Sequence, residues 1–414
     1  MTSSATDPYV FNPFEPGFTD DPYPHYARLR ATDPVHEHPL GFWMLGRHAD
    51  VSALLRAKHS VEIRNAATSP LLELQARAGT EQTSALTPSM LRKDPPDHTR
   101  LRRLVSQAFT RRAVEALEPR VIALVDAALE RIEQAIAEHG RADLVAELAY
   151  PLPFTVICEM LGMPETDHTR LRELAGILVS ALEPVTDPQR LATVGAAARE
   201  ISGRIAQVIE VKRAQPGDDL LTALIAAEDD GDQLSDTELV SQVVLLYVAG
   251  HETTVNLIGN GTIALLSYPD QFALLAQRPD LDENAVEKLL RYDSPVQQSR
   301  RIMLAEHEVG ARVIPAGAVV IAGLASANRD EDVFGPDAEQ LRLDRDNARA
   351  QLSFGGGPHH CLGAALARLE GRIALGRLVR RFPNLRLVGD ITWNGRINLR
   401  GPRDLPVTVT TAAN

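Results

Sequence analysis

A long apolar segment in the middle of the chain restricts the possible folds more than any other feature. Residues 235–267 open with Ser235-Asp-Thr-Glu238, a capping box whose serine hydroxyl and glutamate carboxylate satisfy free backbone N–H groups. A Tyr-Pro pair at 268–269 ends the helix. At 1.5 Å per residue such a helix is roughly 50 Å long. Because residues 243–249 are apolar on every side, we expect the helix to run through the centre of the molecule.

Other segments surround this helix with shorter periodic patterns. The spacing of apolar residues predicts helices at 24–30, 110–138, 192–213, 282–292 and 361–381. Short apolar runs predict strands at 42–45, 312–315, 319–323, 386–388 and 406–410. Helices dominate and no linker divides the chain. We therefore expect a mainly α fold with small β sheets, in which residues 1–414 form a single large domain.

The composition limits the classes of function. Of the 414 residues, 44% are hydrophobic and 24% are charged, as in ordinary globular proteins. A net charge of −12 argues against a general nucleic-acid-binding protein. Two cysteines, Cys158 and Cys361, exclude a disulfide framework and favour a reducing compartment. No segment has the roughly 20 apolar residues that span a bilayer, and no signal peptide is visible, so we expect a cytoplasmic protein.

A glycine-rich loop brings one cysteine to the start of a helix. The segment reads Phe354-Gly-Gly-Gly-Pro-His-His-Cys361-Leu-Gly363. Glycines let the backbone approach a flat partner closely, and the start of a helix stabilises a thiolate. These features favour a metal-ligating thiolate over a buried structural cysteine, which is expected to describe Cys158. A zinc site formed by His359, His360 and Cys361 is a poor alternative, because three adjacent residues do not readily close one tetrahedron.

The spacing F-x-x-G-x-x-x-C-x-G at 354–363 resembles the haem-ligand loop of cytochrome P450 monooxygenases. The resemblance covers nearly the whole chain. It implies that Cys361 binds the iron of haem b through its thiolate, with Phe354 and Gly363 in the loop around it. It also implies that the haem lies between the helix at 235–267 and the layer formed by the cysteine loop and the last helix.

The sequence Ala-Gly-His-Glu-Thr-Thr at 249–254 resembles the oxygen-activating motif of the same family. Ala249 and Gly250 are small where the helix passes the haem. The resemblance implies that Thr253 hydrogen-bonds the oxygen bound to the iron and that Glu252 relays protons from water. These two residues are the predicted catalytic residues.

Two further features of this helix are assigned no functional role. His251 is expected to be a structural histidine with a hydrogen-bond partner. Gly259-Asn-Gly261-Thr-Ile-Ala264 fits the G-x-G-x-x-A pattern of dinucleotide-binding sites. That fingerprint requires a preceding strand, so inside a helix it does not predict such a site.

The resemblance also implies donors for the two haem propionates. His98 and Arg102 are four residues apart on one helix face, and His359 stands two residues before the cysteine. Arg301 matches an arginine of the family, with Arg300 as the neighbouring alternative. Considered alone, each of these histidines and arginines is more often a charged surface residue than a propionate ligand.

One position departs from the family pattern. Its Glu-x-x-Arg motif should occupy 288–291, but the chain reads Glu287-Lys288-Leu-Leu-Arg291. Lys288 and Arg291 repel each other at i,i+3, while Glu287 could reach Arg291 at i,i+4. Arg345 matches the third member of the family's triad. We expect the departure to affect haem retention or stability rather than the chemistry.

The leading hypothesis is a monomeric haem-thiolate monooxygenase that inserts one atom of O2 into a small organic molecule, by hydroxylation or epoxidation. Electrons would come from NAD(P)H through a separate ferredoxin reductase and ferredoxin. The alternatives are a peroxide-driven peroxygenase, which does not need Glu252 and Thr253, and a catalytically weak haem or ligand carrier, which Lys288 motivates.

Partner and substrate contacts are expected on two sets of segments. Ten arginines could form a basic face that steers an acidic ferredoxin, or they could simply be solvated on the surface. They are Arg100, Arg102, Arg103, Arg111, Arg112, Arg368, Arg372, Arg377, Arg380 and Arg381. Substrate selectivity is expected from the loops at 63–90, 180–188, 296–299 and 396–401. They mix apolar and polar residues, so a natural product, a steroid and a fatty acid are all compatible.

Overall fold

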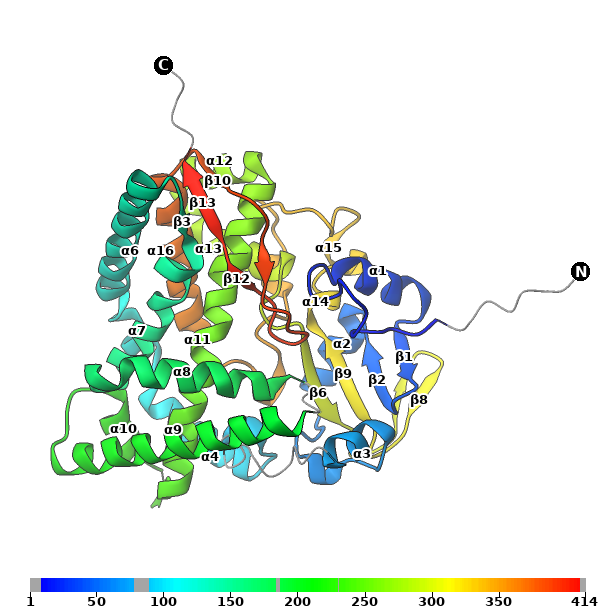
Figure 1. The fold of residues 1–414 in the computed structure, drawn as a ribbon. Coiled ribbons are helices and arrows are strands. Elements are labelled where there is room, and N and C mark those ends of the chain that lie inside the picture. The colour runs from blue at the N-terminus through cyan, green and yellow to red at the C-terminus, as the bar shows by residue number, and fades with distance from the viewer. Residues whose placement is uncertain (1–8, 78–88, 184–186, 230, 410–414) are drawn as a thin grey trace, which may run out of the picture.

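The computed structural model describes residues 9–77, 89–183, 187–229 and 231–409 (Figure 1). Its helices are α1 (Tyr23–Thr32), α2 (His48–Arg56), α3 (Pro70–Arg77), α4 (Asp97–Ala108), α5 (Arg111–Glu115), α6 (Glu118–His139), α7 (Pro151–Met160), α8 (His168–Val179), α9 (Pro188–Ala214), α10 (Leu220–Ala226), α11 (Asp236–Ser267), α12 (Pro269–Gln277), α13 (Asp282–Tyr292), α14 (Leu324–Ala327), α15 (Glu331–Phe334) and α16 (Ala364–Arg381). Its strands are β1 (Val35–His38), β2 (Phe42–Leu45), β3 (Ala142–Asp143), β4 (Glu228–Asp229), β5 (Asp232–Gln233), β6 (Gln298–Ile302), β7 (His307–Val309), β8 (Arg312–Ile314), β9 (Val319–Gly323), β10 (Leu385–Leu387), β11 (Thr392–Trp393), β12 (Pro402–Asp404) and β13 (Pro406–Val409). Helices dominate, as the sequence predicts.

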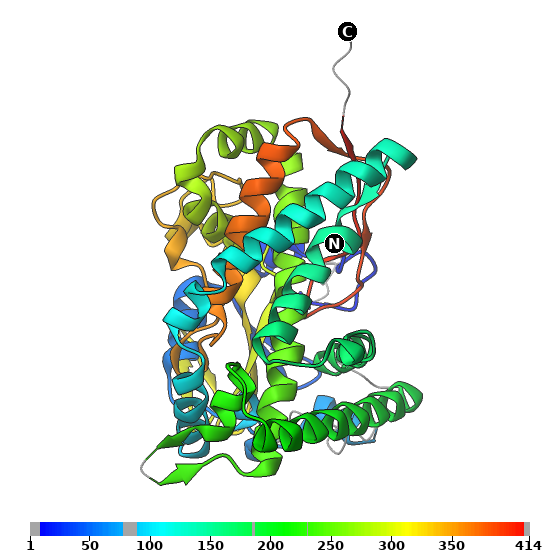
Figure 2. The ribbon, with the colours of Figure 1, turned by 90° about the vertical axis from the view of Figure 1, so that its left-hand side faces the viewer.

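Helix α11 is the central element of the fold. It has 32 residues and begins with the predicted capping box, in which Ser235 Oγ accepts from Glu238 N and Glu238 Oε2 accepts from Ser235 N. It contacts α7, α8, α9, α13 and α16. Figures 1 and 2 show it passing between α16 and the layer formed by α7–α9. Every residue from 241 to 248 is buried, so the predicted central position is confirmed.

Glycines let α11 pack closely against its neighbours. A Cβ on Gly259 would lie 2.6 Å from Pro402 Cγ, and one on Gly261 would lie 3.1 Å from Leu375 Cδ1. These contacts occur in the interior of a continuous helix, so no strand directly precedes the glycine pattern. The G-x-G-x-x-A pattern therefore serves helix packing, because larger side chains at these positions would separate α11 from β12 and α16.

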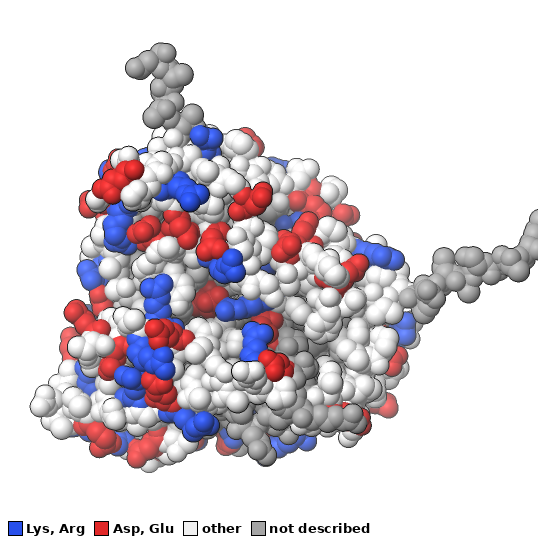
Figure 3. All heavy atoms as spheres, in the orientation of Figure 1, with Lys and Arg blue, Asp and Glu red and all other residues white. Residues whose placement is uncertain are grey.

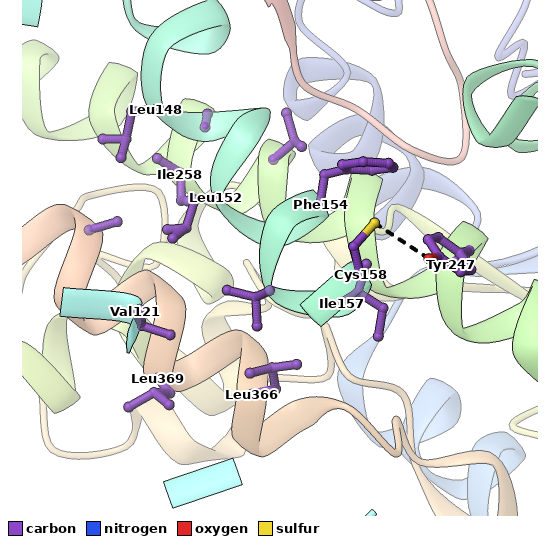
Figure 4. Packing of buried hydrophobic residues seen from close by; sticks show 14 of the residues in the cluster. Val121, Leu148, Leu152, Phe154, Ile157, Cys158, Tyr247, Ile258, Leu366 and Leu369 are labelled. Carbon is purple, nitrogen blue, oxygen red and sulfur yellow. Dashed lines mark hydrogen bonds between the residues drawn. The ribbon is translucent and has the colours of Figure 1, made fainter. Parts of the chain in front are cut away.

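A large apolar core surrounds the central helix. In Figure 4, Phe154 and Cys158 of α7 pack beside Tyr247 of α11, and the Tyr247 hydroxyl donates to Cys158 Sγ at 3.4 Å. Cys158 has no exposed surface, and burial raises its thiol pKa to about 12. The expectation of a structural role for Cys158 is confirmed.

A small sheet lies on the other side of the molecule, with strand order β1–β2–β9–β6. Strands β2 and β9 are parallel, while β6 runs antiparallel to β9 and places Arg301 opposite Val320. The sequence did not predict β6, because Gln-Ser-Arg-Arg-Ile has no alternating apolar pattern. Its extended form depends on pairing with β9 and on a bridge from Ile302 to Ser60.

Several predicted boundaries are confirmed and others need correction. Helix α13 and strands β2 and β9 match the predicted ranges. The segment 110–138 forms two helices, because the chain turns after α5 and a proline occupies the first turn of α6. The last helix starts at Ala364, so Cys361 precedes it. Among the described helices, none combines the length and apolar character needed to span a bilayer.

Candidate active site

The cysteine loop has a geometry that only glycine permits at one position. Gly357 has φ +64°, and a Cβ there would lie 2.3 Å from the backbone oxygen of Leu55. The loop closes through a hydrogen bond from Cys361 N to Phe354 O at 2.9 Å. A rigid turn of this kind fixes the direction in which the sulfur leaves the backbone, just before the first turn of α16.

The Cys361 side chain is accessible although many protein atoms surround it. Burial raises the pKa of its thiol, whereas the Gly363 N–H group and the guanidinium groups of Arg102 and Arg368 lower it. The arrangement thus supplies partners for a thiolate but leaves its sulfur open to a ligand. Among the described residues, no three His, Cys, Asp or Glu side chains are grouped to hold a metal ion.

The middle of α11 is accessible, like the Cys361 sulfur. Ala249 and Gly250 are exposed directly after the buried run at 241–248, and a Cβ on Gly250 would meet nothing within 4 Å. Thr253 Oγ1 donates to the Ala249 carbonyl at 2.8 Å. Thr254 Oγ1 lies 3.3 Å from the Gly250 carbonyl. The helix therefore has small, exposed residues at 249–250, and the half-buried Thr253 hydroxyl lies one turn further along.

Glu252 is held by an arginine from a distant loop. Its carboxylate is buried and accepts from Arg396 Nη1 at 2.5 Å. Burial raises the pKa of Glu252, and the Arg396 charge opposes this shift without cancelling it. Sequence reasoning assigned no role to Arg396 beyond its place in a predicted substrate loop. The two residues are 144 positions apart, and no local pattern links them.

His251 is a structural histidine in its contacts. Its Nε2 lies 3.2 Å from the Tyr150 carbonyl, and its ring packs edge-on against Tyr150 and Phe154. A carbonyl only accepts, so the ring proton lies on Nε2. Burial lowers the His251 pKa to about 4, which keeps the ring neutral at pH 7.

Glu370 of α16 is a buried acid that the sequence did not single out. Burial raises its pKa to about 8, while a hydrogen bond with Thr254 opposes the shift. Its carboxyl group is therefore protonated at pH 7, close to the hydroxyl groups of α11. An acidic residue inside a helix carries no sequence signal that separates this position from a surface glutamate.

The structure brings together the four residues expected to bind propionates. The rings of His98 and His359 lie 4.1 Å apart, and Arg102 Nη2 donates to the His360 carbonyl at 2.7 Å. Burial together with the charges of His98, Arg301 and Arg102 lowers the His359 pKa to about 3.

Two further arginines, Arg92 and Arg300, lie close to each other. Arg300 of β6 is the alternative noted in the sequence, and Arg92 is an addition for which the sequence gave no signal. Both are half-buried, burial lowers the pKa of each, and the charge of Arg300 lowers the pKa of Arg92 further. Within the described residues, Arg92, Arg300 and Arg301 form no ion pair. The charge of Asp94 partly opposes the lowering of the Arg301 pKa, and Asp94 accepts from Val61 N and from Ser60 Oγ.

The positive charges without acidic partners show whether these residues suit haem. Buried cations without acidic partners are unfavourable unless a ligand supplies negative charge. A group with two carboxylates would provide it, and an arginine fork matches a carboxylate geometrically. The accessible thiol and the small residues of α11 meet the other requirements. The residues present fit a haem.

The expected contact between Glu287 and Arg291 is absent. Glu287 accepts from Arg368 of α16 and from Gln351 Nε2 at 3.1 Å. Arg291 instead donates to the backbone carbonyl groups of Asn328, Ala338 and Gln340. The prediction was wrong because helical spacing permits an i,i+4 pair but does not exclude a better partner on another helix.

Lys288 is buried with no exposed surface, and its Nζ has no hydrogen-bond partner among the described residues. Burial is the main cause that lowers its pKa to about 7, and the charges of Arg291 and Arg345 lower it further. Arg345 Nη2 donates to the Asp337 carbonyl at 3.0 Å. The side chain that replaces the family's glutamate thus adds a cation beside Arg291 and Arg345, although Arg345 pairs with Asp337 and the charges of Asp346 and Asp344 partly oppose the lowering of the Lys288 pKa.

The expected basic docking face is largely neutralised. The arginines of α16 tie it to α6 and α13 through the pairs Arg372–Glu118, Arg377–Asp126, Arg381–Glu133 and Arg380–Asp282. Arg100 pairs with Glu238 and Asp232, and Arg111 pairs with Glu115. On the face drawn in Figure 3, where β12, β13, α8 and α9 lie in front, acidic and basic side chains are interspersed. The four α16 arginines therefore serve helix–helix ion pairs, which sequence spacing alone could not reveal.

The predicted substrate loops are partly described. The loops at 63–90 and 180–188 include residues 78–88 and 184–186, which lie outside the described residues. The other two meet in space, because Val296 bridges to Leu399 and Gln297 N donates to Asn398 O at 2.8 Å.

Comparison with known proteins identifies the family. The family model described as Cytochrome P450 matches residues 74–277 and 279–386. Vitamin D(3) 25-hydroxylase of Pseudonocardia autotrophica is 42% identical over 418 residues, covering 99% of this chain and 98% of the relative. Cytochrome P450 monooxygenase PikC of Streptomyces venezuelae is 43% identical over 400 residues, covering 94% and 91%.

A solved structure shares the fold. It is the cytochrome P450 PksS of the bacillaene polyketide synthase from Bacillus subtilis, with a TM-score of 0.87 and 36% identity, covering 97% of this chain and 100% of that chain. Sequence and structure thus agree over almost the entire chain, and the protein belongs to the cytochrome P450 family of haem-thiolate oxidoreductases.

Proposed function

We propose that this protein is a haem b monooxygenase that inserts one atom of O2 into a small organic molecule by hydroxylation or epoxidation. The observation that carries the proposal is the accessible Cys361 sulfur in a loop closed by Gly357 and by the Cys361 N to Phe354 O hydrogen bond. When bound through this thiolate, haem supplies the electron-rich iron that activates O2.

Four residues hold the propionates in this proposal: His98, Arg102, Arg301 and His359. Because these arginines lack acidic partners among the described residues, haem binding relieves their mutual repulsion. Phe354 positions the loop, since Arg368 lies 4.4 Å over its ring.

Glu252 and Thr253 bind and transfer protons at the accessible stretch of α11. Thr253 donates its proton to the Ala249 carbonyl, which leaves the lone pairs of Oγ1 free to accept from a water molecule or a substrate. Glu252 has a raised pKa, so its carboxyl group gains a proton nearer to neutral pH than an exposed glutamate does. Ala249 and Gly250 provide room beside these groups.

Electrons are proposed to come from NAD(P)H through a separate ferredoxin reductase and ferredoxin, with the chain acting as a cytoplasmic, single-domain monomer. The named relatives include a vitamin D(3) hydroxylase and a 6-deoxyerythronolide B hydroxylase. A bulky lipophilic substrate of steroid or polyketide size is therefore proposed. A panel of such ligands, scored by the spin-state shift of the iron, tests this class.

The reduced carbon-monoxide adduct tests the proposed function directly. A strongly red-shifted Soret band is expected for the wild type, because a thiolate donates electron density to the iron. The band should vanish in Cys361→Ser, with Cys158→Ser as the matched control that retains it. No red-shifted band in the wild type, or its persistence in Cys361→Ser, contradicts the proposal. Product formation with NADH and partners, compared with hydrogen peroxide alone, separates a monooxygenase from a peroxygenase.

A further inference from the structure

The loop between β11 and β12 is fixed by its own hydrogen bonds. Asn394 Nδ2 donates to the Leu399 carbonyl at 2.8 Å, and Arg396 N donates to Asn394 Oδ1 at 3.1 Å. Asn394 N also donates to the Gly401 carbonyl at 2.9 Å. These bonds tie residues 394–401 together as one compact unit.

A single carboxylate anchors this unit to another part of the fold. Glu183, directly after the helical turn Ser180–Leu182 that follows α8, accepts from three consecutive backbone N–H groups of residues 397–399 at 2.9–3.1 Å. Asn398 Nδ2 donates to the Leu182 carbonyl at 2.6 Å. Within the described part of the chain, Glu183 forms no ion pair with a basic side chain. Its charge is therefore balanced by the loop's N–H groups.

Arg396 extends from the same unit to the acid of α11. It directly precedes the three N–H groups that Glu183 binds, and its guanidinium donates to Glu252. Side-chain exposure is 20% for Arg396 and 11% for Glu252, so solvent screens the pair only weakly. A displacement of the loop would move Arg396 and leave a buried carboxylate without its cation.

We propose that Glu183 and Arg396 are positioning residues: Glu183 fixes the 394–401 loop, and the loop holds Arg396 on Glu252 and thereby sets the protonation of that acid. The part concerning turnover rests on the proposed function, in which Glu252 relays protons. The arrangement links Glu183, 214 residues before Ile397, to the proton-handling site.

The other charged and titratable groups near Glu252 do not replace Arg396. Arg172 of α8 lies 3.9 Å over the Tyr150 ring and bonds to that side chain. Burial keeps the Tyr150 hydroxyl protonated by raising its pKa, and His251 is neutral at pH 7. Removal of Arg396 therefore leaves desolvation as the dominant influence on Glu252, which raises its pKa further.

A double-mutant cycle tests the proposal in the holoenzyme. The protonation of Glu252 is followed by the infrared band of its carboxylic acid, assigned by its loss in Glu252→Gln. Arg396→Gln should move the midpoint of this titration upward by about one to three pH units. Glu183→Ala should give a shift in the same direction, and Glu183→Gln, which keeps one acceptor oxygen, a smaller one.

Two results distinguish the proposed positioning of Arg396 by Glu183 from independent effects of the two substitutions. The Arg396→Gln, Glu183→Ala double variant should shift the midpoint no further than Arg396→Gln alone. Additive shifts, or a wild-type midpoint in Glu183→Ala, overturn the proposal. Glu173→Ala is the control, because Glu173 lies on α8, ten residues before Glu183, but pairs with Arg170 at the surface. It should leave the midpoint unchanged.

A second readout separates this proposal from the proposed function. The pH profile of product formed per NAD(P)H consumed should move upward in both Arg396→Gln and Glu183→Ala. If the infrared midpoints shift as expected but this profile stays fixed in every variant, including Glu252→Gln, the positioning holds and the proton-relay function fails. If the profile responds to Glu252→Gln while Glu183→Ala leaves the midpoint unchanged, the proposed function stands and the positioning fails.

Discussion

Glu287 of α13 pairs with Arg368 of α16, and not with Arg291 one turn further along its own helix. Arg368 also lies over Phe354, so this ion pair connects α13 to the cysteine loop. Arg291 is satisfied by backbone carbonyl groups. The carboxylate of the family's Glu-x-x-Arg motif is thus absent rather than displaced by one residue, and Lys288 occupies its position without a partner among the described residues.

Replacing Lys288 with glutamate should stabilise the protein and improve haem retention. Lys288→Glu removes a buried cation next to Arg291 and Arg345 and adds the opposite charge. Leaving a buried charge unpaired costs about 3–5 kcal/mol, and part of this is recovered. The free energy of unfolding and the rate of haem loss to an acceptor globin measure the effect. Lys288→Met is the control, which removes the charge without adding a carboxylate; unchanged or weaker haem retention in Lys288→Glu contradicts the prediction.

The destabilising effect of Lys288 should depend on pH. Its pKa is about 7 in the folded protein, against about 10.4 for an unperturbed lysine. Between these values the unfolded chain binds one more proton, so stability rises with pH relative to Lys288→Met. The difference in unfolding free energy between wild type and Lys288→Met should be largest at or below pH 7 and shrink toward pH 10. Urea denaturation at pH 6.5, 8 and 9.5 measures it, and a constant difference would count against a buried, unpaired amine.

Gly357→Ala should disrupt the cysteine loop more than Gly355→Ala. Both glycines have positive φ, which costs an alanine roughly 1–2 kcal/mol. Only at Gly357 would the added Cβ also collide with the Leu55 backbone, at 2.3 Å; at Gly355 the nearest atom is 3.8 Å away. We expect Gly357→Ala to lose most of the thiolate-type carbon-monoxide spectrum and Gly355→Ala to retain it. Equal losses in unfolding free energy and spectrum would show that the collision is unimportant.

Thr253→Ala should uncouple NAD(P)H consumption from product formation. The substitution removes the hydroxyl beside the accessible stretch of α11 while leaving its helical backbone intact. We expect a several-fold rise in NAD(P)H consumed per product, measured together with hydrogen peroxide release. Thr262→Ala is a matched control, because Thr262 makes the same hydrogen bond to the carbonyl four residues earlier, at 2.8 Å, in the buried part of α11. An unaffected ratio in Thr253→Ala removes Thr253 from the proposed relay.

Arg301→Met should have opposite effects on the two forms of the protein. Burial lowers the pKa of Arg301 to about 10, and it forms no ion pair among the described residues. Removing this charge should raise the melting temperature of the haem-free protein and weaken haem binding at least tenfold. Haem titration and thermal unfolding measure the two effects. Arg342→Met, which removes an exposed arginine paired with Asp337 and Asp344, should change neither; lower stability of haem-free Arg301→Met contradicts the charge argument.

The amino-acid sequence by itself determined the features that depend on neighbouring residues. The capping box at Ser235, the uninterrupted apolar run of α11 and the positive-φ glycines before Cys361 are local, because helix periodicity and backbone sterics act over a few residues. They predicted the mainly α fold, the central helix and the cysteine loop.

The tertiary structure decided which charges meet. Arg396 pairs with Glu252, which is 144 positions away in the sequence, and Glu287 pairs with Arg368, which is 81 positions away. Arginines of α16 pair with acids of α6 that are more than 240 positions away. Strand β6 likewise exists because β9 is available to pair with it. No sequence periodicity predicts these ion pairs, because a long charged side chain contacts its partner only after the backbone has placed distant elements side by side.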